Sequence, residues 1–151
     1  MIDSIDRLII RELQRDGRRS NREIAERVGL SPNATGVRVK RLIDGGVITG
    51  IHARLDHAEV GRPLEALIEC HLLGYPDVEE VMEFFRADDR IIEAFHITGK
   101  ADYILRVAAA STEDLHDLLQ EIGYRRRWMD DIETRLVLER IWAQSEPGVT
   151  V

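Results

Sequence analysis

The sequence predicts an α+β fold in two parts, an N-terminal helix-turn-helix followed by a C-terminal ferredoxin-like βαββαβ domain. Three short capped helices are expected in the first fifty residues, and the remainder follows the order strand, helix, strand, strand, helix, strand. Charge divides the chain at the same place, because residues 1–50 carry ten basic and seven acidic side chains although the 151-residue chain has a formal net charge of −7. We therefore expect different partners for the two parts, with a polyanion for the first.

Two helices open the chain. The first has an apolar stripe at helical spacing, formed by Ile5, Leu8, Ile9 and Leu13, and should end near Asp16-Gly17. The second begins with a capping box in which Ser20 accepts a hydrogen bond from the Glu23 amide while the Glu23 carboxylate reaches back to the Ser20 amide. Gly29 is expected to end this second helix.

A third helix should start two residues later, with Ser31 as its cap and Pro32 at its first position, and Gly45-Gly46 should end it. Its inner face consists of Thr35, Val39 and Leu42. Three short helices with a tight glycine-containing turn between the last two are typical of a helix-turn-helix. Such a motif lays its second helix in the major groove of double-stranded DNA.

The outward face of the third helix is basic and is predicted to bind DNA. Base contacts are expected from Asn33, Val37 and Arg38. Phosphate contacts are expected from Arg18, Arg22, Lys40 and Arg41, and Ser31 completes the predicted DNA-binding set. A basic helix can also be a solvated face without a partner, but the coincidence of caps, turn and basic surplus favours DNA binding.

The C-terminal half begins after a segment, VITGIHARLD, that is predicted to be a strand, and a polar loop that places the domain boundary near Gly61. Strands are expected at residues 64–72, 90–98, 102–109 and 132–142, and helices around 78–85 and 115–122. This order is the split βαβ arrangement of a ferredoxin-like sandwich, in which both helices pack on one face of an antiparallel sheet.

The opposite face of that sheet carries apolar residues that a single copy would leave in water. They are Leu67, Ile104, Val137 and Ile141. Burial against a second subunit is the expected solution, so we predict a homodimer. Two-fold symmetry would also present two recognition helices to two DNA half-sites.

No metal, cofactor or membrane is expected. The five histidines lack standard zinc-ligand spacing, and no nucleophile elbow, phosphate loop or HExxH is present. The single cysteine, Cys70, is expected to be a buried and inert thiol. The absence of a long apolar run and the charged N-terminus predict a cytoplasmic protein without a membrane partner.

Three segments, NREIAERVGLSP, RVKRLIDGGVI and ITGKADYILRV, occur in an order and spacing that resemble the Lrp/AsnC, or feast/famine, transcriptional regulators. The resemblance runs from about Ile5 to Ile141. It implies a winged helix-turn-helix at 1–50, a linking strand and loop at 51–62, a ferredoxin-like effector-binding and oligomerisation domain at 63–142, and a tail at 143–151. It also implies homodimers that assemble further, often to octamers, and a response to amino acids or similar metabolites bound between subunits.

By the same resemblance, the effector is expected at the loop formed by Thr98, Gly99, Lys100, Ala101 and Asp102. Backbone amides around Gly99, with Thr98 or Lys100, suit a carboxylate, and Asp102 suits an ammonium group. The plain alternative is a hairpin turn, because Gly-Lys-Ala-Asp is ordinary turn chemistry. Where the family often has an aromatic residue, Ala101 stands here, and its smaller side chain would alter the preferred ligand size or signal a lost response.

Two further departures concern other segments. Gly36 and Val37 occupy helix-surface positions where the family usually has more polar or helix-favouring residues, which bears on DNA sequence preference. YRRRWMDDIETRLVL replaces a shorter Leu-Pro-Gly-Val connection. Its basic residues, Arg125, Arg126 and Arg127, are expected to pair at the surface with Asp130 and Asp131 rather than to bind ligand or DNA.

Several alternatives stay open at the level of function. An assembly of such dimers would compact DNA architecturally if binding were independent of sequence, since phosphate contacts serve both roles. Sirohaem decarboxylases are similar in their two-part architecture and hold a tetrapyrrole with basic and histidine residues. In such an enzyme, His96 and the arginine cluster would hold the tetrapyrrole. A hetero-oligomer with a homologous subunit is the remaining possibility. The expectation is nevertheless a regulator and not an enzyme, because the third helix keeps its basic residues.

Overall fold

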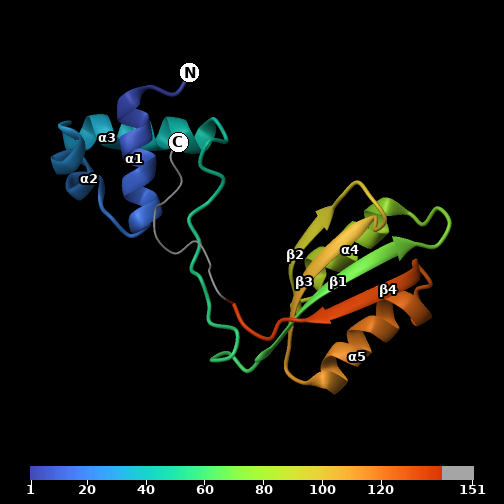
Figure 1. Cartoon of the computed structure of the whole chain (residues 1–151). Helices are drawn as coiled ribbons and strands as arrows, with labels where there is room; N and C mark the ends of the chain where they lie inside the picture. The colour runs from blue at the N-terminus through green and yellow to red at the C-terminus, as the bar shows by residue number, and fades with distance from the viewer. Residues whose placement is uncertain (141–151) are drawn as a thin grey trace. The chain divides into compact units, whose positions relative to one another are not determined.

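Three helices form the first of two units in the computed structural model, which describes residues 1–140 (Figure 1). They are α1 (Ser4–Arg15), α2 (Asn21–Val28) and α3 (Pro32–Asp44), and the units comprise Met1–Arg54 and Leu55–Arg140. Ile9, Ile24 and Leu42 are buried where the three helices meet. Among the helices of residues 1–140, none is long and apolar enough to cross a membrane.

The predicted helix ends of this unit are confirmed. The side chain of Ser20 accepts from the Glu23 amide, and the Glu23 carboxylate accepts from the Ser20 amide at 2.8 Å. Gly29 ends α2 in the left-handed conformation with φ 71°. Ser31 caps α3 by accepting from the Ala34 amide, directly before Pro32. These signals succeed because each depends only on neighbouring residues.

The second unit is a four-stranded antiparallel sheet in the order β2-β3-β1-β4, with helices on one face (Figure 1). Its strands are β1 (Leu64–Leu72), β2 (Ile91–His96), β3 (Tyr103–Ala109) and β4 (Met129–Leu136). Its helices are α4 (Val78–Ala87), α5 (Thr112–Gln120) and a π-helical turn, η1 (Glu121–Arg125), that continues α5. This is the predicted ferredoxin-like arrangement.

One sheet face and the two helices enclose the core of the second unit. Ile68 and Cys70 of β1, Leu105 of β3, Val81 of α4 and Leu118 of α5 all have no exposed surface. Burial raises the pKa of the Cys70 thiol to about 12, so it remains protonated and unreactive at neutral pH. The predicted burial of this cysteine is confirmed.

The structure corrects two predicted strands. No strand lies between Asp44 and Leu64, so the prediction for VITGIHARLD is wrong; branched residues favour extended backbone, but a strand also needs a neighbouring strand. The last strand runs from Met129 to Leu136 and not from 132 to 142, because its pairing with β1 begins at Leu72 and ends at Ala66. Residues 141 and 142 of the predicted strand lie outside the described residues.

The free face of the sheet carries the predicted apolar residues. Leu67 is 38% exposed and Phe95 is 49% exposed, while Ile104 and Val137 are half-buried. Phe95 lies opposite Ile104 in the β2–β3 pairing. Ile141 was also predicted for this face but lies outside the described residues. Among residues 1–140, the helices of this unit pack on the other face only.

Candidate nucleic-acid interface and ligand-binding unit

The outward face of α3 presents the predicted base-contacting residues unequally. Asn33 and Val37 are exposed, with Val37 at 64%. The side chain of Arg38 is only 25% exposed, because its guanidinium is bound by two carboxylates of α1 and its cap. Asn33 and Val37 are therefore open to a partner, while Arg38 is already anchored.

Asp6 is a buried carboxylate that binds both Arg38 and Arg41. Its side chain has no exposed surface, and its two oxygens accept from Arg38 at 2.8 Å and from Arg41 at 2.5 Å. Asp3, the N-cap of α1, accepts from Arg38 at 2.6 Å and forms a reciprocal capping box with Asp6. Burial raises the pKa of Asp6, but hydrogen bonds from the Asp3 amide and Arg38 and the charge of Arg41 hold it below its usual value.

Sequence reasoning missed this cluster. The spacing of Asp3 and Asp6 is the signal of a capping box, and it would have placed the start of α1. Nothing in that local pattern indicates that Asp6 is buried, because its arginine partners lie 32 and 35 residues away.

Glu12 forms a second acidic centre on α1. Its side chain is 10% exposed and binds Arg19, Arg15 at 3.1 Å and Arg27 at 3.4 Å. These contacts join the first helix to the following turn and to α2. Much of the basic surplus of the N-terminal unit is therefore already paired within the fold, which the charge count alone does not reveal.

The predicted phosphate-contacting residues other than Arg41 are well exposed. Side-chain exposure is 93% for Arg18, 80% for Arg22 and 74% for Lys40. Each has only a surface partner, respectively Asp16, Glu26 and Asp44. Exposed pairs of this kind contribute about 0–1 kcal/mol, so phosphates can readily replace them. Arg41 remains 56% exposed although Asp6 holds one of its nitrogens.

Gly36 has a steric environment that its sequence position did not indicate. A Cβ atom at this position would lie 2.9 Å from Nδ2 of Asn21, the first residue of α2. The glycine therefore leaves room for the side-chain amide of Asn21, at the cost of about 1 kcal/mol of helix propensity relative to alanine.

In the second unit, the predicted effector loop joins β2 to β3. Thr98, Gly99 and Lys100 are exposed, whereas Ala101 is 5% exposed. Asp102 is half-buried, and its Oδ2 accepts from the Leu72 amide at 2.8 Å. The second carboxylate oxygen of Asp102 has no hydrogen-bond partner within residues 1–140. The loop thus offers one carboxylate oxygen and an exposed lysine, but not the side chain of Ala101.

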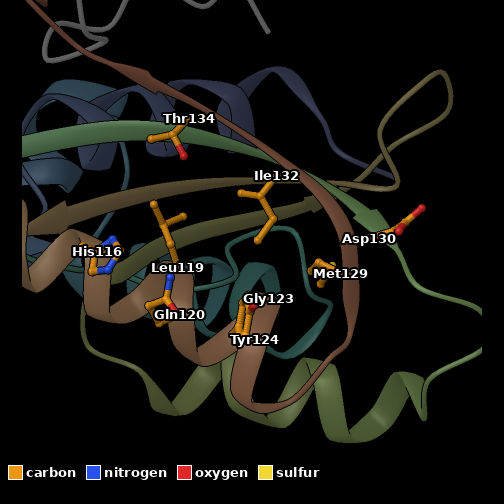
Figure 2. A pocket seen from close by; sticks show the side chains of 9 residues that line it. All are labelled: His116, Leu119, Gln120, Gly123, Tyr124, Met129, Asp130, Ile132 and Thr134. Atoms are coloured by element: carbon orange, nitrogen blue, oxygen red, sulfur yellow. The ribbon is translucent and has the colours of Figure 1, made fainter.

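A pocket of about 390 Å³ that the sequence did not predict lies between α5, η1 and β4 (Figure 2). Its lining residues are His116, Leu119, Gln120, Gly123, Tyr124, Met129, Asp130, Ile132 and Thr134. Figure 2 shows Ile132 pointing from β4 toward the helix, where its Cδ1 would be 3.0 Å from a Cβ on Gly123. The lining combines apolar side chains, among them Leu119, Met129 and Ile132, with polar ones, as in many small-molecule sites.

Two residues of the arginine cluster, Arg125 and Arg126, pair at the surface, but with other partners than predicted. Arg125 binds Asp117 and Glu121, at 2.9 and 2.8 Å. Arg126 binds Glu121 at 3.1 Å and lies 4.8 and 4.7 Å above the rings of Phe84 and Trp128. The prediction of Asp130 and Asp131 as partners is wrong, because the π-helical turn directs the arginines toward α4 and α5 and away from β4.

The helix-turn-helix with its exposed basic face defines a DNA-binding protein that has a second, ferredoxin-like unit. Residues 2–49 match the family model for winged helix-turn-helix DNA-binding domains, and residues 65–147 match the model for the Lrp/AsnC ligand-binding domain. The protein belongs to the Lrp/AsnC family of transcriptional regulators, as its sequence motifs indicate.

Curated relatives and solved structures support the same family assignment. The leucine-responsive regulatory protein of Haemophilus influenzae is 37% identical over 142 residues, covering 93% of this chain and 86% of the relative. The regulator AldR of Mycobacterium tuberculosis is 34% identical, covering 93% and 79%. A Neisseria meningitidis transcriptional regulator in complex with L-Met has a TM-score of 0.87 at 28% identity, covering 97% of each chain. LrpC of Bacillus subtilis has a TM-score of 0.85 at 26% identity, covering 95% and 99%.

Proposed function

We propose that this regulator responds to an amino acid, which binds the ligand-binding unit, alters assembly and thereby alters binding to sequence-specific DNA sites. The observation that carries the proposal is the similarity to the N. meningitidis regulator solved with L-Met. A linkage of this kind requires that the two assemblies have different affinities for the effector.

The proposed effector site is the loop Thr98–Asp102. The exposed Lys100 and the amides near Gly99 suit a carboxylate, and the uncommitted oxygen of Asp102 suits an ammonium group. Because Asp102 also holds the Leu72 amide, a ligand at this loop would contact a carboxylate that is already fixed in direction. A fixed partner costs less ordering on binding.

The proposed assembly is a homodimer formed through the free face of the sheet, with further association toward an octamer. Leu67, Phe95 and Ile104 supply apolar surface, while Arg106 and Arg135 form ion pairs with glutamates on the same face. Arg106 and Arg135 lie directly opposite Leu67 on the neighbouring strands, so the face mixes apolar side chains with paired charges, and protein interfaces are of comparable mixed composition.

Calorimetric titration of the full chain with each standard amino acid tests the effector, and fluorescence anisotropy of labelled DNA with and without the bound amino acid tests the response. Asp102→Asn keeps an acceptor for the Leu72 amide but removes the charge, so we expect roughly tenfold weaker effector binding. Asp130→Asn, an exposed acid lining the α5–β4 pocket, is the matched control.

The outcomes separate the alternatives. Loss of binding in Asp130→Asn with full binding in Asp102→Asn would move the site to the α5–β4 pocket. No binding of any amino acid, or binding that leaves assembly and DNA affinity unchanged, would refute the proposal. Equal affinity for all DNA sequences would instead favour the architectural role.

A regulator is favoured over a decarboxylase-like enzyme by the surroundings of the residues that such an enzyme would need. The His96 ring stacks on Tyr103 with 4.9 Å between ring centres. Arg125 and Arg126 are held by Asp117 and Glu121. These side chains therefore have partners within the fold already.

A further inference from the structure

We propose that Asp6 is a positioning residue for DNA readout, which holds the guanidinium groups of Arg38 and Arg41 in place on α3 and so determines how well the protein distinguishes its site from other DNA. This inference concerns the DNA-binding unit alone and does not depend on the proposed effector.

The two oxygens of Asp6 face one arginine each. Oδ1 accepts from Nη1 of Arg38 at 2.8 Å, and Oδ2 accepts from Nη2 of Arg41 at 2.5 Å. The arginines are three residues apart on α3, so one carboxylate sets the direction of two side chains on the helix predicted to enter the major groove. Oδ2 also accepts from the Asp3 amide at 3.1 Å.

The helix cap alone does not account for this arrangement. Capping requires Asp6 only to accept from the Asp3 amide. Nevertheless Asp6 has no exposed surface, and a buried charge is destabilising unless it is paired. Arg38 and Arg41 supply the pairing, and removing Asp6 would leave Arg41 without its anchor and Arg38 with Asp3 alone.

Both arginines keep donors for DNA. A guanidinium has five N–H donors, and the carboxylates occupy one nitrogen of each. An unanchored arginine loses rotamer entropy when it is fixed at a base edge that demands one geometry. Anchoring removes part of that loss before DNA arrives.

The negative charge of Asp6 acts in the same direction. Attraction to phosphates is independent of sequence and grows with net positive charge. A carboxylate beside two arginines weakens that attraction, while anchoring favours contacts that need fixed geometry. Both effects raise the ratio of affinities for the preferred site and for other DNA.

Asp44, at the end of α3, provides a matched control for the charge of Asp6. Asp44 pairs with Lys40 at 2.6 Å, and their side chains are 60% and 74% exposed. Removal of its charge changes the net charge as much as removal of the Asp6 charge, but releases no buried anchor. Asp44→Asn therefore isolates the effect of charge.

The test compares the full-length wild type, Asp6→Asn and Asp44→Asn. The probes are a duplex that the wild type enriches from a randomised pool and a duplex of the same composition with shuffled base order. Anisotropy titrations at several salt concentrations give both affinities. For Asp6→Asn we expect the ratio of the two affinities to fall roughly tenfold, with equal or tighter binding to the shuffled duplex. Asp44→Asn should tighten both affinities together and leave their ratio unchanged.

A third variant, Asp3→Asn, tests the proposal if Asp6→Asn does not fold. Asp3→Asn keeps the N-cap, since asparagine caps as well as aspartate, and weakens only the hold on Arg38. For Asp3→Asn, the ratio of the affinities for the enriched and the shuffled duplex should fall by a smaller factor than for Asp6→Asn. An unchanged ratio in folded Asp6→Asn, or in Asp3→Asn if the former is unfolded, would overturn the proposal. So would an equal fall in Asp44→Asn, or a wild type that enriches no sequence.

Discussion

Arg90 joins two separate segments of the ligand-binding unit through charged hydrogen bonds. Its side chain is 17% exposed and binds Asp88 at 2.6 Å and Asp114, in the first turn of α5, at 3.1 Å. Burial raises the pKa of Asp88, but the hydrogen bonds from Arg90 outweigh burial and hold that pKa below its usual value. The ion pair therefore makes stability depend on pH.

The sign follows from the lowered pKa. Unfolded Asp88 has a pKa of about 3.9, so its contribution is fully present above about pH 4 and is lost as pH falls through the lower folded value. We expect Asp88→Asn to reduce the free energy of unfolding by about 1–3 kcal/mol at neutral pH. Urea titrations followed by tryptophan fluorescence should show the difference from wild type shrinking below about pH 4. A difference that persists unchanged in acid would contradict the assignment.

Arg127 has backbone strain that its neighbours lack. Its φ is 54°, in the left-handed region that disfavours side chains by about 1–2 kcal/mol. Arg127→Gly should relieve that strain but add freedom to the unfolded chain, so we expect a net gain of about 0.5–1 kcal/mol in the free energy of unfolding.

Arg126→Gly is the control for that substitution in the same urea titrations. Arg126 has φ −91° and lies above Phe84 and Trp128, so its loss should destabilise the unit. Destabilisation by Arg127→Gly would instead indicate that its side chain makes a stabilising contact.

Single residues were predictable where their partners are close in sequence. Ser20, Gly29 and Ser31 were assigned correctly because caps involve residues three or four apart. Asp6 and Glu12 were missed, since acidic residues are rarely buried and part of their arginine pairing comes from other helices, from Arg27 on α2 for Glu12 and from Arg38 and Arg41 on α3 for Asp6. Burial of charge is decided by packing, which no local pattern records.

At the scale of elements, the start of α3 has two functions that one substitution can separate. Ser31 accepts from the Ala34 amide at 3.2 Å and also stands in the predicted DNA-binding set. Ser31→Ala should cost about 1 kcal/mol of stability through the lost cap. Ser31→Asp should keep the cap and the thermal midpoint, but weaken DNA binding because its charge repels phosphate.

Thermal unfolding and anisotropy with labelled DNA check both variants. Equal DNA affinity for Ser31→Asp and wild type, at a thermal midpoint that is also unchanged, would remove Ser31 from the interface.

Element boundaries show where pattern reasoning works and where it does not. β1 was predicted at residues 64–72, its full extent, because alternation along a half-buried strand is a direct record of its environment. The start of β4 and the turn η1 were not foreseen. Met129 pairs with Leu72 across a register shift, and that pairing is set by the partner strand.

At the scale of the whole molecule, the free sheet face predicts an oligomer. Phe95, at 49% exposure, is the main candidate for an interface residue, because a large aromatic side chain contributes strongly when it is buried between subunits. Phe95→Asp should raise the dissociation constant of the dimer at least about tenfold. Sedimentation over a range of protein concentrations measures it.

Tyr75→Asp is the matched control, since Tyr75 is fully exposed in the loop between β1 and α4. An oligomer unaffected by Phe95→Asp, or equally disrupted by Tyr75→Asp, would place the interface elsewhere. If the expected dimer is confirmed, loss of DNA affinity in Phe95→Asp would further link assembly to the pairing of recognition helices.

The sequence by itself determined the three helices of the first unit, the βαββαβ order of the second, the caps of the recognition helix, the inward face of β1 and the family. Each of these depends on periodicity, on short-range hydrogen bonds or on motifs that are read along the chain. Only the tertiary structure decided that Asp6 and Glu12 are buried beneath arginines, that η1 turns Arg126 onto aromatic rings, and that a pocket opens between α5 and β4. These features arise where residues distant in sequence meet, and their energies depend on burial and on distances that packing alone sets.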